Sequence, residues 1–195
     1  MFKKCMENHV RILFFEGLAE AQSLIAEEAI KTSSFGKSME HFLLSFNNYE
    51  ILTQECPENL LGWNGIARVS KYIAELEPSK LLEDVLKHEG QQAAFDVSIG
   101  CWKKSLELDP TCSVSLRNLA LTYLSKAIFC SGANEVPELF ELSVTTAVKA
   151  VEAQSGVPEN WLTLGLASYW KGKIYNLFFC CYLNSRSICY VSYWC

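Results

Sequence analysis

Nine cysteines and three histidines are the residues of this chain best suited to metal binding or thiol chemistry. Five cysteines are scattered singly, and the other four, Cys180, Cys181, Cys189 and Cys195, lie in the last stretch without a Cys-x-x-Cys pair. The histidines, at positions 9, 41 and 88, adjoin no cysteine cluster, whereas a structural zinc site needs four closely spaced ligands. The sequence therefore predicts no metal site, no disulfide framework and a reducing compartment.

Other groups that could act in catalysis also lack suitable neighbours. The adjacent carboxylates Glu27-Glu28 and Glu83-Asp84 are expected to face water, where their pKa values would stay ordinary. Cys101 stands beside Trp102 with no nearby histidine, which is typical of a core thiol rather than a nucleophile. The chain has no Gly-rich phosphate loop, Gly-x-Ser-x-Gly elbow or His-Glu-x-x-His motif. We predict a non-enzymatic protein with no catalytic residue, no cofactor and no metal.

Composition narrows the class of partner. The 195 residues are 50% hydrophobic and have a net charge of −5, which disfavours direct nucleic-acid binding because that needs a basic surface. The apolar run at residues 12–15 is too short for a signal-peptide core, and no stretch approaches 18 apolar residues. We therefore expect protein partners, no membrane association, and a location in the cytoplasm, with the nucleus as a further option.

A large–small hydrophobic signature recurs four times and predicts the elements that position these residues. Each copy has a bulky residue, an aliphatic residue three positions later, and then Ala or Gly, all on one helical stripe. The copies are Phe15-x-x-Leu18-Ala19, Trp63-x-x-Ile66-Ala67, Leu116-x-x-Leu119-Ala120 and Trp161-x-x-Leu164-Gly165. The small residue would let a neighbouring backbone approach, and the register places Trp63 and Trp161 in the core. This pattern is typical of tetratricopeptide (TPR) arrays, in which helix pairs stack on one another.

Helical periodicity and chain breaks give the expected organisation, an all-α solenoid of stacked antiparallel helix pairs. Helices are expected at about 11–29, 38–55, 60–76, 91–108, 113–129 and 138–153, with a short piece at 80–88 and a seventh helix holding Trp161. Cys56-Pro57 and Asp109-Pro110 end helices, and Asn59 is placed to cap the third. Successive signatures are 48, 53 and 45 residues apart, longer than the TPR period of about 34, so the array is irregular.

Three segments follow from this pattern: a terminal segment at 1–9, a helical array of about three and a half helix pairs at 10–174, and an atypical tail at 175–195. The tail contains four cysteines, many aromatic residues and a single charge. It could be a membrane-surface or β-prone segment. The interpretation that we favour is a truncated product whose end is translated non-coding sequence, because its composition differs from the rest of the chain.

The groove of such an array is a candidate binding surface, and the positions beside the signatures test one ligand class. Chaperone-binding TPR domains hold a C-terminal carboxylate with Lys, Asn and Arg on successive first helices. Here the corresponding positions are Glu16, Asn64, Arg117 and Leu162, followed by Glu20, Arg68, Leu121 and Leu166. Asn64, Arg68, Arg117 and Asn118 form part of a polar groove, but the alternating Lys/Asn set is missing. We therefore do not expect an Hsp70/Hsp90 co-chaperone, and the groove ligand and its binding residues stay unknown.

The order and irregular lengths of the units resemble the large TPR scaffold subunit of the superkiller (Ski) complex over roughly residues 10–174. Four stretches support the resemblance. The first three are Glu16 to Ala21 with its long following helix, Pro57 to Ala67, and Cys101 to Leu108. The fourth begins with Leu119 to Ala127 and continues through a loop at 131–137 to Ala147–Val151 and Trp161–Gly165. The resemblance implies a scaffold that holds a DExH RNA helicase and WD40-repeat subunits, which feed mRNA to the cytoplasmic exosome for 3′-to-5′ decay. It also implies that this chain is a segment of the N-terminal part of that array. An unrelated TPR adaptor in trafficking, ubiquitin ligation or chaperone assembly is the alternative.

Overall fold

The structure, a computed structural model, describes residues 2–76, 84–129 and 135–191, with side chains described at 10–76, 90–129 and 135–175. This part of the chain forms seven α-helices. They are α1 (Phe2–Lys31), α2 (Phe35–Glu55), α3 (Leu60–Glu75), α4 (Asp84–Leu108), α5 (Ser113–Phe129), α6 (Val136–Ala153) and α7 (Pro158–Val191). The carboxylate pair at 83–84 and the cysteines at 5, 130, 180, 181, 189 and 195 lie outside the described side chains.

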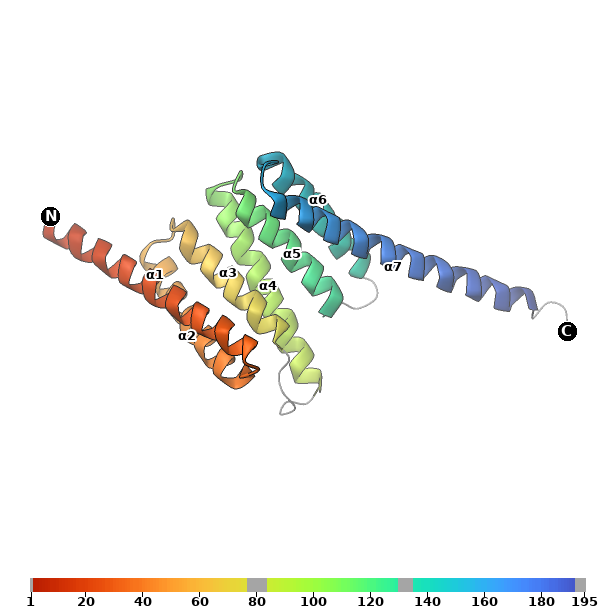
Figure 1. The fold of residues 1–195 in the computed structure, drawn as a ribbon, viewed down its shortest axis with the longest axis horizontal. Helices are drawn as coiled ribbons and strands as arrows, with labels where there is room; N and C mark the ends of the chain where they lie inside the picture. The colour runs from red at the N-terminus through yellow and green to blue at the C-terminus, as the bar shows by residue number, and fades with distance from the viewer. Residues whose placement is uncertain (1, 77–83, 130–134, 192–195) are drawn as a thin grey trace.

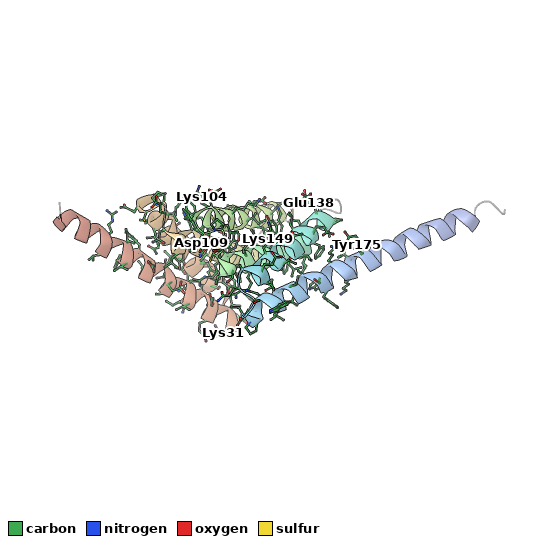
Figure 2. The ribbon with its side chains drawn as sticks, turned by 90° about the horizontal axis from the view of Figure 1, so that it is seen from above. Lys31, Lys104, Asp109, Glu138, Lys149 and Tyr175 are labelled. Carbon is green, nitrogen blue, oxygen red and sulfur yellow. The ribbon has the colours of Figure 1, made fainter. Side chains whose placement is uncertain are left out.

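The helices pack in consecutive pairs, α1 with α2, α3 with α4, and α5 with α6, and α7 packs against α6 and α5. The first helices also contact one another, α1 with α3, α3 with α5, and α5 with α7. Figure 1 shows the pairs in a row, with the free ends of α1 and α7 projecting at opposite ends of the array. In Figure 2 the array is seen from above, and Tyr175 marks where α7 leaves its neighbours. The expected all-α solenoid of helix pairs is therefore confirmed.

Each pair is joined through the small residue of its signature. The hydroxyls of Ser45, Ser98 and Ser143 on the second helices donate to the backbone carbonyls of Ala19, Ala67 and Ala120, at 2.7, 2.7 and 2.8 Å. All six residues are fully buried. An alanine at this point lets the second helix approach closely enough for its serine to reach the main chain. We call this hydrogen bond the serine tie.

A buried phenylalanine lies three residues before each of these serines. The pairs are Phe42 with Ser45, Phe95 with Ser98, and Phe140 with Ser143, and each phenylalanine is at most 1% exposed. Two of these rings belong to separate core clusters: Phe42 lies with α1, α2 and α3, and Phe140 lies with α3 to α6. Burial of such a ring contributes roughly 1.5–3 kcal/mol, so the Phe-x-x-Ser motif supplies both packing and register.

Local sequence accounts for the helix ends as expected. The Asn59 side chain accepts a hydrogen bond from the Gly62 amide at 2.9 Å and caps α3. After α4, the Asp109 carboxylate accepts from the amide and the hydroxyl of Thr111, at 3.0 and 2.9 Å, which fixes the turn before α5. Three helices are clearly longer than the sequence predicts: α1 begins at Phe2, α7 continues to Val191, and α4 begins at Asp84 rather than at about 91. The described part of the short piece expected at 80–88 therefore belongs to α4, and residues 80–83 lie outside the described part.

The prediction that Trp161 is a core residue is wrong. Its side chain is 54% exposed, and its indole N–H donates to the Ser155 carbonyl at 2.8 Å, so the ring lies beside the turn before α7. Trp63 makes the corresponding bond to the Pro57 carbonyl at 2.7 Å, but its ring is partly buried against the core cluster formed by α1, α2 and α3. Burial at this signature position therefore depends on the neighbouring helices, which cover Trp63 and leave Trp161 open.

Candidate functional site

A pocket of about 370 Å³ lies where the first three helix pairs meet. Three successive first helices supply most of its wall, and α2 and α4 supply one aromatic residue each. The lining residues are Glu16, Glu20, Tyr49, Leu61, Asn64, Gly65, Arg68, Trp102, Val114 and Asn118. The pocket thus combines carboxylates, amides and a guanidinium with aliphatic and aromatic surface.

An ion pair reinforced by a phenol occupies one side of the pocket. The Arg68 guanidinium donates to the Glu20 carboxylate, and the Tyr49 hydroxyl donates to the same oxygen at 2.6 Å. Burial alone would raise the pKa of Glu20, but the hydrogen bonds from Tyr49 and Arg68 and the positive charge of Arg68 lower it overall. Burial and the bond to Glu20 raise the pKa of Tyr49, so its hydroxyl stays protonated. The charge of Arg68 is therefore matched within the protein, and its positive charge is not free for a ligand.

A backbone contact positions this network. An ideal Cβ placed on Gly65 would come within 2.4 Å of the Tyr49 ring. Only glycine leaves room for the ring to lie flat against α3 and extend its hydroxyl to Glu20. Gly65 thus determines where the polar side of the pocket lies.

A second network fixes Asn64 at the junction of α3, α4 and α5. The Ser115 hydroxyl donates to the Asn64 side-chain oxygen at 3.1 Å and lies 2.8 Å from the Ser105 hydroxyl. Both serines are fully buried. Asn118 donates to the Val114 carbonyl at 2.9 Å, within α5. The two amides are therefore held by the protein while the half-buried Asn64 side chain borders the pocket.

Apolar side chains form the remainder of the wall. Leu61 and Val114 are 54% and 45% exposed, although both line a concave surface. Trp102 also lines the pocket and is 2% exposed. Glu16 is half-buried, and in the described part of the chain it makes no ion pair or side-chain hydrogen bond. The surface available to a ligand is therefore aliphatic, with one uncompensated carboxylate.

The structure brings together Glu16, Glu20, Asn64, Arg68 and Asn118, which the sequence placed beside the signatures. The other groove positions, Arg117, Leu121, Leu162 and Leu166, do not line this pocket. Leu162 and Leu166 are instead 63% and 40% exposed on α7.

Sequence reasoning missed the two aromatic residues that the second helices contribute. Tyr49 and Trp102 each lie four residues after the serine of a Phe-x-x-Ser motif, on the same helical stripe. The repeat of this spacing in 42–49 and 95–102 was the available signal.

Groups considered for chemistry lie apart from the pocket or are unreactive. The Cys101 thiol packs between the two main core clusters, and burial raises its pKa to about 11. Glu28 pairs with Lys31 at 2.8 Å on the surface. Among the described residues no group of three or more metal-binding side chains occurs, and no described helix is long and apolar enough to cross a membrane.

The repeated pairs, joined at equivalent positions and lined by their first helices, define a TPR-like helical array. No protein-family model matches the chain, and no curated protein matches it. Among solved structures, the chain is similar to one titled TPR2B-domain:pHsp70-complex of yeast Sti1, with 14% identity and a TM-score of 0.39. The alignment covers 78% of this chain and 97% of that one. Similarity at this level does not assign a ligand.

Proposed function

We propose that this chain is a non-enzymatic protein–protein interaction scaffold whose pocket binds a segment of a partner polypeptide. The observation that supports this most is the exposure of Leu61 and Val114 inside a concave surface built by three successive helix pairs. Exposed aliphatic side chains bordered by fixed polar groups are typical of a recognition surface.

The charges favour an internal, basic segment over a free C-terminus. Arg68 is paired with Glu20, and Glu16 has no partner among the described residues, so the pocket has an excess of negative charge. A terminal carboxylate would need unpaired cations, as in a carboxylate clamp. A segment with Lys or Arg placed near Glu16 and an aliphatic residue against Val114 would match the pocket better.

The more specific proposal is that the chain belongs to the scaffold subunit of the superkiller complex, acting in cytoplasmic 3′-to-5′ mRNA decay. The spacing of the four signatures and the stretches that resemble this subunit support the assignment. Its partners would then be a DExH RNA helicase and WD40-repeat subunits, and RNA would be bound by those partners rather than by this acidic chain.

Affinity purification of the tagged chain from cytosol, followed by mass spectrometry, tests both levels. The test variant is Leu61→Arg with Val114→Arg, which places two cations in the pocket. The control is Leu43→Arg with Val97→Arg, at positions of similar exposure, 49% and 43%, on α2 and α4. Circular dichroism should show that both variants fold.

Recovery of a DExH helicase and a WD40 protein by the wild type and the control, with loss in the pocket variant, is the expected result. Recovery of a different set of proteins that depends on the pocket would reject the superkiller assignment and favour an adaptor in trafficking, ubiquitin ligation or chaperone assembly. Partners that remain bound to the pocket variant would refute the pocket as the binding site.

A further inference from the structure

Equivalent positions of the first helices form rows that cross the array. Helix α3 contacts α1 on one side and α5 on the other, and the three helices run in the same direction in Figure 1. Packed helices have axes about 8–10 Å apart, so a given register position recurs across the array at about this interval. A ligand that lies across the first helices therefore meets equivalent positions at regular steps.

The first row is aliphatic and open. It holds the residue two positions before the bulky residue of each signature, which is Leu13 in α1, Leu61 in α3 and Val114 in α5. Their side chains are 54%, 54% and 45% exposed, although Leu61 and Val114 line the pocket. A ligand covers this row if it presents three aliphatic side chains at the interval of the helices.

The second row has opposite charges at its two ends. It holds the residue directly after the bulky residue of each signature, which is Glu16 in α1, Asn64 in α3 and Arg117 in α5. All three residues are half-buried, and neither Glu16 nor Arg117 makes an ion pair with a described residue. The charges available to a ligand are therefore negative at α1 and positive at α5.

The interval between the helices selects the conformation of a polypeptide ligand. A polyproline II segment has three residues per turn and advances about 3.1 Å per residue, so every third side chain lies on one face, about 9.3 Å apart. In a β-strand, residues three apart lie on opposite faces. A single turn of α-helix, about 5.4 Å long and about 10 Å wide, occupies about 420 Å³, more than the pocket of about 370 Å³. The polyproline II conformation therefore matches both rows at once.

We infer that these two rows bind a polyproline II segment of a partner polypeptide, with a cation near one end and a carboxylate near the other. Aliphatic side chains at every third position contact the first row. The residue after the first of them is a cation that faces Glu16, and the residue after the last is a carboxylate that faces Arg117. The segment is the one assigned to the pocket under the proposed function, on which this inference rests, and it extends past the pocket lining to Arg117.

The test is an NMR titration of the ¹⁵N-labelled full chain with the peptide Leu-Lys-Pro-Leu-Gln-Pro-Leu-Glu, acetylated and amidated to remove its terminal charges. The reporter is the indole N–H of Trp102, which lines the pocket and has no acceptor among the described residues. Its resonance is identified by its loss in Trp102→Phe. The expected result is a saturable shift. The peptide Leu-Lys-Leu-Pro-Gln-Leu-Pro-Glu has the same composition without the threefold spacing of leucines, and should bind about fivefold more weakly or worse.

Charge variants test the order of the two ends. Arg117→Glu should weaken binding of the first peptide by about threefold, and a peptide with lysine in place of its glutamate should reverse this preference. Lys149→Glu is the matched control, because it makes the same change of charge at an exposed position of α6 and should leave the preference unchanged. Circular dichroism should show that both variants keep the helical content of the wild type.

Any of four outcomes would overturn the inference. They are no shift of the Trp102 reporter at millimolar peptide, equal binding of the respaced peptide, equal effects of Arg117→Glu and Lys149→Glu, and tighter binding of a peptide with alanine in place of both prolines, which would assign a helix. The proposed function fails separately, if the partners purified from cytosol do not depend on Leu61 and Val114.

Discussion

Replacement of Gly65 by alanine tests the geometry on which the pocket depends. The new Cβ would lie 2.4 Å from the Tyr49 ring, so the ring must move by about 1 Å to reach ordinary contact. Tyr49 is only 3% exposed, and its hydroxyl is bound to Glu20. Overpacking costs about 1–3 kcal/mol, and loss of the hydrogen bond adds about 1 kcal/mol. Better helix propensity offsets about 1 kcal/mol, which leaves a net destabilisation of about 1–3 kcal/mol.

Urea unfolding followed by circular dichroism measures this difference. Gly100→Ala is the matched control, since its Cβ would meet nothing within 4 Å and should increase stability by up to about 1 kcal/mol. In a Tyr49→Ala background the effect of Gly65→Ala should also become stabilising, because the obstructing ring is gone. If Gly65→Ala were as stable as Gly100→Ala, the ring would not lie against α3 and the reasoning would be refuted.

Four further predictions concern single residues. Ser98→Ala removes one serine tie and should lower the free energy of unfolding by about 1 kcal/mol; no change in urea unfolding would make the tie dispensable. Trp161→Ala should lower the free energy of unfolding by less than about 1 kcal/mol, and Trp63→Ala should lower it by about 2–4 kcal/mol, because only Trp63 is partly buried. Equal shifts of the two variants in thermal unfolding would contradict this difference in burial. The pKa of Glu20 is lowered from 4.5 on folding, so its stabilisation is present above that pH and lost as the pH falls through the folded value. The stability difference between wild type and Glu20→Gln should therefore shrink between pH 6 and pH 3, and a constant difference would exclude the ion pair. With a pKa of about 11, roughly one part in a thousand of Cys101 is thiolate at pH 8, so the native protein should react slowly with iodoacetamide at this site. Peptide mass spectrometry measures the labelling, and rapid labelling would contradict the burial of the thiol.

The repeated signature was sufficient to predict the helix pairs and their contact points. Ala19, Ala67 and Ala120 lie under their partner helices as the large–small spacing indicates, because this pattern depends on local helical periodicity. The chain breaks around Asn59 and Asp109 were also predicted correctly: a proline ends the preceding helix at both, and Asn59 caps the helix that follows it. Capping is a local interaction, so the sequence is enough to predict it.

The pocket was predictable only in part because it depends on contacts between distant helices. Helical register gave Glu20 and Arg68 but could not show that they pair with each other across 48 residues. Tyr49 reaches the pocket through the space left at Gly65, which no periodicity reveals. Trp161 has the same signature as Trp63 and yet is exposed, because burial is set by the neighbouring helices rather than by the residue itself.

The stacking of helices mainly on their nearest neighbours has a consequence for how the chain opens. In a one-dimensional array, stability is close to a sum of unit and interface terms, so cooperativity weakens with distance along the stack. Among the residues that the structure describes, the pair α1 and α2 contacts the rest of the array mainly through α3 and can detach while α4, α5 and α6 stay folded. Amide exchange should then be graded along the molecule, slowest at its centre, and a two-state midpoint would average several distinct openings.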